Sequence, residues 1–343
     1  MTTSLAIGPA GSFASYFIKS MITARTPPPR SLDLSGQTAI ITGGYTGLGY
    51  ECAAILLSQK LSHLIITVRN QTKGNGAASK LQDQYPNAKI ECWFLDMLDY
   101  DSIQAFANQC NELSRIDMVV LNAGVVVGKF KPNENTKHEE TFSVNYLSTA
   151  LLSLLLLPVL RTKRPPHNQP SRLTIVGSGL ALAASFPERK ASVLFSAFDD
   201  EKYFNYMERY STTKLLLLLF VSKLAEYVDA DDVIINVSDP GYVDNPGLDR
   251  DLSGPMRVLM AAVRRLMAKS LKSGAWAYVD AVTVKGKSSH GGWVANWVVH
   301  AFPKIMYTGD GKKAGCKLWE ETLAEFEWAG VRGILASMGK GST

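Results

Sequence analysis

The stretch Thr38-Ala39-Ile40-Ile41-Thr42-Gly43-Gly44-Tyr45-Thr46-Gly47-Leu48-Gly49 decides the fold of this chain. A short run of apolar and β-branched residues, typical of a buried strand, leads directly into a glycine turn and then into an apolar helix. Glycines let the backbone turn sharply and approach a phosphate closely, and the free N–H groups at the start of the helix stabilise the phosphate charge. The stretch therefore predicts a site for the pyrophosphate of a dinucleotide. A tight strand-to-helix turn without a ligand is the simpler alternative.

Short β-branched runs alternate with longer amphipathic runs from Gln37 onward, which is the pattern of a parallel sheet covered by helices. The predicted strands are Thr38–Thr42, Leu64–Val68, Lys89–Leu95, Met118–Asn122, Leu173–Gly177 and Val233–Ser238. The predicted helices are Leu48–Gln59, Ala77–Tyr85, Asp101–Leu113, Glu139–Leu160, Phe204–Tyr227 and Gly274–Val284. This order predicts the α/β class, with a doubly wound parallel sheet of Rossmann type and helices on both faces.

We expect a single domain with additions at both ends. Residues 1–36 form an N-terminal arm, residues 37–299 the dinucleotide-binding catalytic domain, and residues 300–343 an irregular, aromatic-rich tail that packs on it. The hydrophobic content of 46% is ample for a deep core in a chain of 343 residues.

Charge and cysteine usage exclude several function classes. The net charge of +5 is spread along the chain without clustered arginines, which argues against a nucleic-acid partner. No CxxC pair occurs and the histidines have no metal-ligand spacing, so we expect reduced thiols and no metal.

Leucine-rich stretches at Leu151–Leu160 and Leu215–Phe220 are far shorter than the roughly 20 apolar residues of a membrane span. We predict that both are buried helix faces of a cytoplasmic protein. The apolar segment Phe13–Ile22 lacks a basic start and a cleavage site, and Pro27-Pro28-Pro29 stops it. It is either an arm packed on the domain or a weak membrane or partner contact.

Arg69 follows the second predicted strand, at the place where an NAD-binding fold has an acid that binds the ribose 2′-hydroxyl. A guanidinium can pair bidentately with a 2′-phosphate, and no carboxylate stands nearby to compete. Arg69 therefore predicts NADP(H) as the cofactor, and a solvated surface arginine is the alternative.

Tyr210 and Lys214, in Tyr210-Ser211-Thr212-Thr213-Lys214, lie four residues apart on one face of a predicted helix. A free tyrosine has a pKa near 10, and an adjacent ammonium favours the phenolate. We therefore expect the pKa of Tyr210 to be lowered, which would suit proton transfer at neutral pH. The spacing alone also arises by chance.

With these motifs the chain resembles the short-chain dehydrogenase/reductase family over nearly all of residues 37–299. The family's TGxxxGxG motif matches Gly43, Gly47 and Gly49, and its NAG motif matches Asn122-Ala123-Gly124. The resemblance implies a catalytic tetrad of Asn145, Ser178, Tyr210 and Lys214. It further implies that Asp96 meets the adenine, that Pro240-Gly241 shapes the nicotinamide pocket, and that the Val243 backbone bonds the carboxamide. The cofactor site expected in this way comprises Gly43, Tyr45, Thr46, Gly47, Leu48, Gly49, Arg69, Asp96, Met97, Asn122, Ala123, Gly124, Tyr210, Lys214, Pro240, Gly241 and Val243.

The chain is also similar to fungal biosynthetic reductases related to retinol dehydrogenases. This similarity rests on Leu95-Asp96-Met97, on Leu154–Leu157 before Pro158, and on Gly309-Asp310-Gly311 with Lys317-Leu318-Trp319-Glu320. Two departures concern the pocket: Gly179-Leu180-Ala181 replaces a frequent Ser-x-x-His pattern, and Asn245 stands where PGxVxT has threonine. An epimerase of the longer family branch is disfavoured, because Thr46 occupies the place of its middle glycine.

The resemblance implies that NADPH gives a hydride to a carbonyl carbon while Tyr210 protonates the oxygen. Ser178 would hydrogen-bond that oxygen, Lys214 would hold the nicotinamide ribose, and Asn145 would anchor a water-mediated proton path. We expect a ketoreductase acting on a bulky apolar metabolite in fungal secondary metabolism. The alternatives are a cofactor-binding scaffold without turnover, a non-redox step such as cyclisation or dehydration, and a retinol-type alcohol oxidation.

Residues 244–272 follow Pro240-Gly241 directly and interrupt the alternation of strands and helices. Within them, Met256 to Met267 has apolar residues at helical spacing and three arginines towards another side. We predict a lid over the substrate; a fixed surface helix and a membrane-surface helix are the alternatives. In many relatives the helices matching Glu139–Leu160 and Phe204–Tyr227 form a dimer interface, so both a homodimer and a monomer are possible.

Overall fold

The computed structural model describes residues 2–22, 31–167, 169–244 and 268–339. Most of the predicted lid, including Met256, Met260 and Met267, lies outside these residues, and so does Asn245.

One eight-stranded sheet forms the centre of the molecule, in the order β3-β2-β1-β4-β5-β6-β7-β8. Its strands are β1 (Thr38–Thr42), β2 (His63–Val68), β3 (Lys89–Phe94), β4 (Met118–Leu121), β5 (Ser171–Val176), β6 (Val233–Asp239), β7 (Gly292–Ala295) and β8 (Val298–His300). All neighbours pair in parallel except β8, which is antiparallel to β7. The winding reverses between β1 and β4, and the crevice at such a switch point is where doubly wound sheets bind ligands. The predicted doubly wound α/β fold is confirmed.

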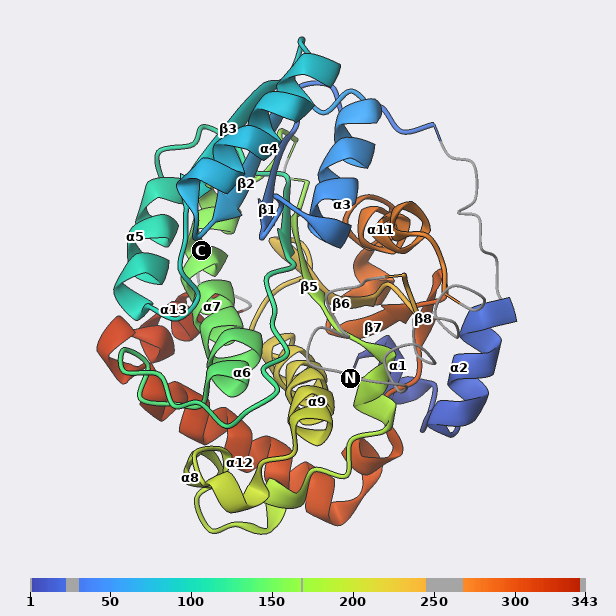
Figure 1. Ribbon diagram of the computed structural model, residues 1–343, viewed down its shortest axis with the longest axis vertical. Coiled ribbons are helices and arrows are strands. Elements are labelled where there is room, and N and C mark those ends of the chain that lie inside the picture. The colour runs from blue at the N-terminus through green and yellow to red at the C-terminus, as the bar shows by residue number, and fades with distance from the viewer. Residues whose placement is uncertain (1, 23–30, 168, 245–267, 340–343) are drawn as a thin grey trace.

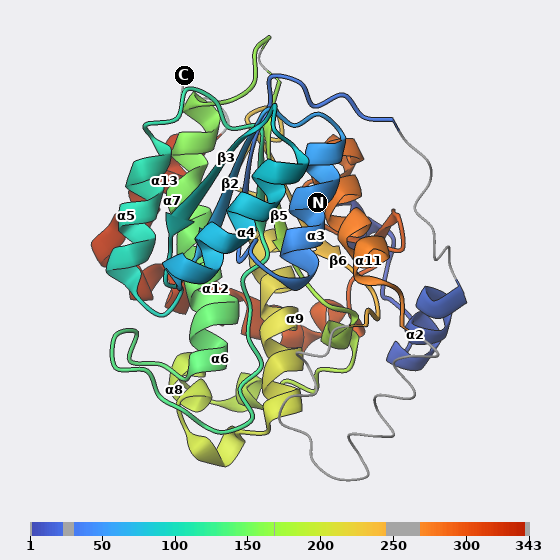
Figure 2. The ribbon, with the colours of Figure 1, turned by 45° about the horizontal axis from the view of Figure 1, so that its top comes forward.

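Helices cover both faces of this sheet (Figures 1 and 2). One face carries α3 (Gly47–Ser58), α4 (Gln71–Gln84) and α11 (Leu271–Val279), whose buried residues form one apolar core. The other face carries α5 (Tyr100–Cys110), α7 (Thr149–Thr162) and α9 (Tyr206–Leu224), which contribute to a second and larger core. Three short helices, α1 (Thr3–Ala6), α6 (Glu140–Phe142) and α8 (Leu194–Phe198), complete the shell together with α2 (Phe13–Ile22).

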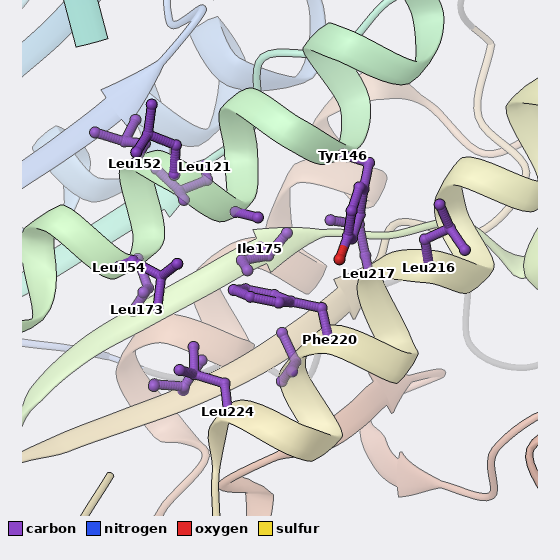
Figure 3. Packing of buried hydrophobic residues seen from close by; sticks show 14 of the residues in the cluster. Leu121, Tyr146, Leu152, Leu154, Leu173, Ile175, Leu216, Leu217, Phe220 and Leu224 are labelled. Atoms are coloured by element: carbon purple, nitrogen blue, oxygen red, sulfur yellow. The ribbon is translucent and has the colours of Figure 1, made fainter. Parts of the chain in front are cut away.

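The leucine-rich stretches are buried faces of α7 and α9, as predicted. Leu154 of α7 and Leu216 of α9 belong to one cluster with Leu173 of β5, and Phe220 fills the space between helix and sheet (Figure 3). Burying a leucine in this way contributes about 1.5–3 kcal/mol to folding. Among the described residues one helix, Glu140–Thr162, is long and apolar enough to cross a membrane, but 89% of its most apolar window is buried inside the fold. It is therefore placed as a core helix.

The C-terminal part of the chain is regular, so the prediction of an irregular tail was wrong. β7 and β8 form a hairpin whose two loop residues, Asn296 and Trp297, both have positive φ (49° and 69°). Positive φ at both loop residues suits the twist of a two-residue hairpin. Tryptophan is unusual in this conformation, so the sequence does not indicate a turn here. Two further helices follow, α12 (Gly309–Glu325) and α13 (Val331–Met338).

Helices α12 and α13 pack on the outside of α7 and α9. The Tyr146 hydroxyl, just before α7, lies 2.6 Å from the Thr322 hydroxyl of α12. Trp319 of α12 packs near Phe220 of α9, with ring centroids 6.0 Å apart, and Val331 of α13 is fully buried. The end of the chain thus extends the larger core.

The start of α4 also differs from the prediction. The helix begins at Gln71, because the Asn70 side chain accepts a hydrogen bond from the Lys73 N–H at 3.0 Å and so caps its N-terminus. Gly74 and Gly76 within this first turn and a half weakened the helical pattern in the sequence.

Candidate active site

The glycine turn lies between the carboxyl end of β1 and the start of α3. Gly43 and Gly47 have positive φ, 64° and 57°, which L side chains rarely adopt. A Cβ on Gly49 would lie 2.6 Å from Asn122 Nδ2 and 2.7 Å from the Gly43 carbonyl oxygen. These positions therefore require glycine. The remaining turn residues predicted for the cofactor, all partly or well exposed, are Tyr45, Thr46 and Leu48.

The segment Asn122-Ala123-Gly124 joins this turn to the residues predicted to be catalytic. The Asn122 amide donates to the Thr42 carbonyl at 2.9 Å, and the N–H groups of Asn122 and Ala123 donate to the Thr42 hydroxyl. A Cβ on Gly124 would lie 3.2 Å from Asn145 Oδ1 and 3.7 Å from Lys214 Nζ. The backbone at Gly124 thus passes close to both.

Arg69 and Asp96 stand at the carboxyl ends of β2 and β3, the two strands beyond β1. Arg69 is exposed directly after β2. Asp96 is held by its own turn, since its Oδ1 accepts from the Leu98 N–H and its N–H donates to the Ser102 hydroxyl, both at 3.0 Å. Met97 is buried and its carbonyl accepts from the Ser148 hydroxyl. All three lie on the same edge of the sheet as the glycine turn.

Asn145 lies in a π-helical segment, Ser143–Ser148, between α6 and α7. Such wide turns occur often at functional sites. Its side chain accepts from the Val125 N–H at 2.8 Å, donates to the Val125 carbonyl at 2.9 Å, and donates to the Thr213 hydroxyl at 3.2 Å. Asn145 therefore connects the loop after β4 to helix α9.

Ser178, Tyr210 and Lys214 come together where β5 ends beside α9. Ser178 follows β5, and its hydroxyl is close enough to the Tyr210 hydroxyl to lower the pKa of Tyr210. Lys214 Nζ donates to the Val176 carbonyl at 2.9 Å and lies 5.6 Å from the centre of the Tyr210 ring. With Asn145 bonded to Thr213, the structure places all four predicted residues around the first turns of α9.

The pKa of Tyr210 differs from the expectation. Burial raises the pKa of Tyr210 to about 12, and this effect outweighs the hydrogen bond to Ser178, which lowers it. Burial also lowers the pKa of Lys214 to about 8, while the Asp239 carboxylate opposes that shift. The expected lowering of the Tyr210 pKa was wrong for this structure, because burial of the Tyr210 hydroxyl decides the direction of the shift.

Pro240, Gly241 and Val243 follow β6 and close the site from the α11 side. Gly241 has a φ of 75°, so the chain turns sharply there. Val243 is buried, and its Cγ1 lies 2.3 Å from where a Cβ on Gly274 would stand, with Leu48 of the glycine turn close to the same point. This segment thus lies across the sheet edge from Gly124.

Sequence reasoning missed Tyr16 and Asp239. Tyr16 of α2 is buried, and its hydroxyl donates to Asp239 Oδ2 although 223 residues separate the two. The ring lies against Gly179, the residue after Ser178. An acid at the last position of a buried strand, directly before Pro240, was the one available signal, and nothing in the sequence pointed from it to Tyr16.

Comparison with known proteins finds relatives along nearly the whole chain. A family profile described as short chain dehydrogenase matches residues 37–185. The short chain dehydrogenase/reductase mfmJ of Annulohypoxylon moriforme is 50% identical over 328 residues, which are 95% of each chain. The short chain dehydrogenase virL of Hypocrea virens is 40% identical over 320 residues, 93% of each chain. The chain therefore belongs to the short-chain dehydrogenase/reductase family of oxidoreductases.

Solved structures share the fold at low sequence identity. The L-sorbose reductase of Gluconobacter frateurii, complexed with NADPH and L-sorbose, has a TM-score of 0.60 at 18% identity, covering 80% of this chain and 99% of that one. The RhlG/NADP active-site complex of Pseudomonas aeruginosa has a TM-score of 0.60 at 20% identity, covering 78% and 97%.

Proposed function

We propose that this protein is an NADP(H)-dependent reductase that converts the carbonyl group of a ketone or aldehyde into an alcohol. The observation that carries the proposal is the meeting of Ser178, Tyr210 and Lys214 beside Gly124, on the sheet edge that also bears the glycine turn. In this arrangement three groups lie next to a dinucleotide site. Ser178 is the hydrogen-bond donor for the carbonyl oxygen, Tyr210 is the proton donor and Lys214 is the cation.

The residues at this edge fit NADP(H). A Cβ on Gly49 would collide with Asn122 and Gly43, whereas a Cβ on Gly47 would meet nothing within 4 Å, so the turn is tight on its inner side and open on the other. In our proposal this turn holds the pyrophosphate, Arg69 pairs with the 2′-phosphate, and Asp96 meets the adenine. Lys214 binds the nicotinamide ribose and the Val243 backbone the carboxamide. The bound cofactor supplies the hydride.

Tyr210 acts in this mechanism as the proton donor. A pKa of about 12 keeps its hydroxyl protonated at neutral pH, which is the form that a reduction consumes. Ser178, which lies beside Tyr210, donates to the carbonyl oxygen and stabilises the negative charge that develops on it. In this proposal the protonated Tyr210 gives its proton to the carbonyl oxygen as the hydride reaches the carbonyl carbon.

Asn145 acts as a positioning residue in this proposal. Its amide holds the Val125 backbone on one side and Thr213 of α9 on the other. It thereby fixes Gly124 next to Lys214, and a water-mediated proton path can start from this region. The proposed substrate is a bulky, largely apolar carbonyl metabolite of fungal secondary metabolism, and the protein is proposed to work in the cytoplasm.

A cofactor-consumption assay tests the proposal. The purified protein is mixed with NADPH and a panel of aryl and alkyl ketones, and NADPH absorbance and alcohol product are measured together. We expect equal amounts of NADPH consumed and alcohol formed. A product that forms without NADPH consumption would indicate a non-redox step, and NADPH binding without turnover of any ketone would indicate a scaffold; either result rejects the proposal.

A further inference from the structure

Helix α2, near the N-terminus, lies beside β8 at the edge of the sheet (Figure 1). Its Tyr16 ring packs against Trp293 of β7, with centroids 5.4 Å apart, and edge-on against His300 of β8 at 5.2 Å. A Cβ on Gly179 would lie only 2.4 Å from Tyr16 Cε1. Because Gly179 follows Ser178 directly, the Tyr16 ring stands one residue from the serine that lies beside Tyr210.

Asp239 anchors this ring. The carboxylate is 3% exposed; its Oδ2 accepts from the Tyr16 hydroxyl and its Oδ1 accepts from the Gly241 N–H at 3.0 Å. A buried carboxylate is stable only when its oxygens are hydrogen-bonded. The hydrogen bond from the Tyr16 hydroxyl therefore helps to stabilise Asp239 in its buried position. One hydrogen bond thus links α2 to the end of β6 and to the turn at Gly241.

A second set of contacts places the same face of α2 along this turn. Phe17 packs edge-on against Tyr242, with centroids 5.3 Å apart. Ser20 is 1% exposed, and its Oγ lies 2.9 Å from where a Cβ on Gly241 would stand. The opposite face is open to solvent, since Ile18 is 52% exposed. Helix α2 therefore turns Tyr16, Phe17 and Ser20 towards the active site.

We propose, resting on the reductase function above, that Tyr16 is a positioning and specificity residue, which Asp239 holds as a wall of the carbonyl pocket beside Ser178. The wall limits the bulk that a ketone can carry on the Ser178 side of its carbonyl group. Such ketones are small on that side and extend away from α2. Gly179 contributes to the same wall, because only glycine at this position leaves room for the Tyr16 ring so close to the proposed site of the substrate carbonyl oxygen.

Steady-state kinetics with acetophenone and benzophenone test this wall, because the two ketones differ in bulk on one side of the carbonyl. Tyr16→Ala should raise the kcat/KM ratio of benzophenone to acetophenone by about tenfold, mainly through the KM of benzophenone. Tyr16→Phe keeps the ring and should retain the ratio of the parent within about threefold. Ile18→Ala, on the exposed face of the same helix, is the matched control and should not change it. An unchanged ratio in Tyr16→Ala overturns the proposal.

Quenching of bound NADPH fluorescence by acrylamide gives a readout without turnover. Quenching should be stronger in Tyr16→Ala than in the parent and in Ile18→Ala, because the pocket is then open beside Ser178; equal quenching overturns the wall. If the parent binds NADPH but reduces no ketone, the reductase function fails while the quenching still decides the position of Tyr16. Should Tyr16→Ala not fold, Tyr16→Leu, which retains more of the packing, takes its place in both measurements.

Discussion

The cofactor side and the substrate side of the proposed active site are built in different ways. On the cofactor side, Gly43 to Gly49 span the turn after β1 and the start of α3, two elements that are adjacent in the chain. On the substrate side, Tyr16 meets Asp239 across 223 residues. The conformation of a local strand-turn-helix unit is determined by its own glycines. The position of a wall made by distant segments depends instead on how the whole chain packs. The proposed catalytic residues lie where these two sides meet.

The largest expected effect is at that meeting point. Tyr210→Phe should lower kcat by about 10²–10⁴-fold, because it removes the proton donor and leaves the ring. NADPH affinity should stay close to that of the parent. Fluorescence titration with NADPH and steady-state rates on the same preparation measure both quantities. A rate within a few-fold of the parent would show that Tyr210 does not transfer the proton.

Substitution of Arg69 tests whether a change on the cofactor side affects cofactor binding alone. Arg69→Ala should weaken NADPH binding by roughly ten- to a hundredfold, since a charge-assisted hydrogen bond contributes about 1.5–3 kcal/mol. NADH binding should change little, and the benzophenone to acetophenone ratio should not change at all. Titration of both cofactors is the measurement. Equal weakening of NADPH and NADH would mean that no 2′-phosphate is bound at Arg69.

A smaller effect concerns the long-range contacts of the C-terminal helices. His138 Nδ1 lies 2.6 Å from Asp199 Oδ2, and its Nε2 lies 3.3 Å from Glu325 Oε1 of α12. Burial lowers the pKa of His138, but the two carboxylates outweigh burial and raise it to about 9. Because the folded-state pKa lies above the usual value of 6.5, this stabilisation is complete below pH 6.5 and is lost as the pH rises through 9.

Thermal unfolding between pH 6 and 10 checks this expectation. The parent should lose on the order of 1–3 kcal/mol of stability across the alkaline part of this range, a fall in Tm of a few degrees. His138→Gln is the control, since it cannot titrate and should remove that part of the pH dependence. An identical pH profile for both proteins would show that His138 does not hold α12 through its charge.

Much of the fold could be predicted because it repeats a local pattern. The prediction for Thr38–Thr42 matches the bounds of β1, and the other five predicted strands overlap β2 to β6 with slightly different ends, since a buried parallel strand is a short β-branched run between turns. The hairpin of β7 and β8 could not be predicted, because Trp297 occupies a turn position that usually takes a small residue. The pKa of Tyr210 could not be predicted from the Tyr210 and Lys214 spacing either, since burial, which no short motif encodes, decides its direction.

The same distinction applies to the site. The motif residues around Gly49, Asn122, Ser178 and Tyr210 lie together at one sheet edge, because each follows a neighbouring strand or faces it from α9. Tyr16 could not be predicted, because its position depends on the packing of α2 against β7 and β8, which were not expected to be strands. The roles of the motif residues and of Tyr16 in binding and catalysis remain predictions, which the experiments above test.

Helices α12 and α13 have a consequence for how activity depends on concentration. They occupy the outer side of α7 and α9, through contacts such as Tyr146 with Thr322 and Trp319 with Phe220. Because the chain's own helices cover this surface, we expect no dimer to form through α7 and α9, and therefore no assembly equilibrium there for dilution to shift. We therefore expect the specific activity to stay constant over roughly a thousandfold dilution, and the Tm to be independent of protein concentration. A reaction rate strictly proportional to the amount of enzyme would let a cell tune this step through expression level alone.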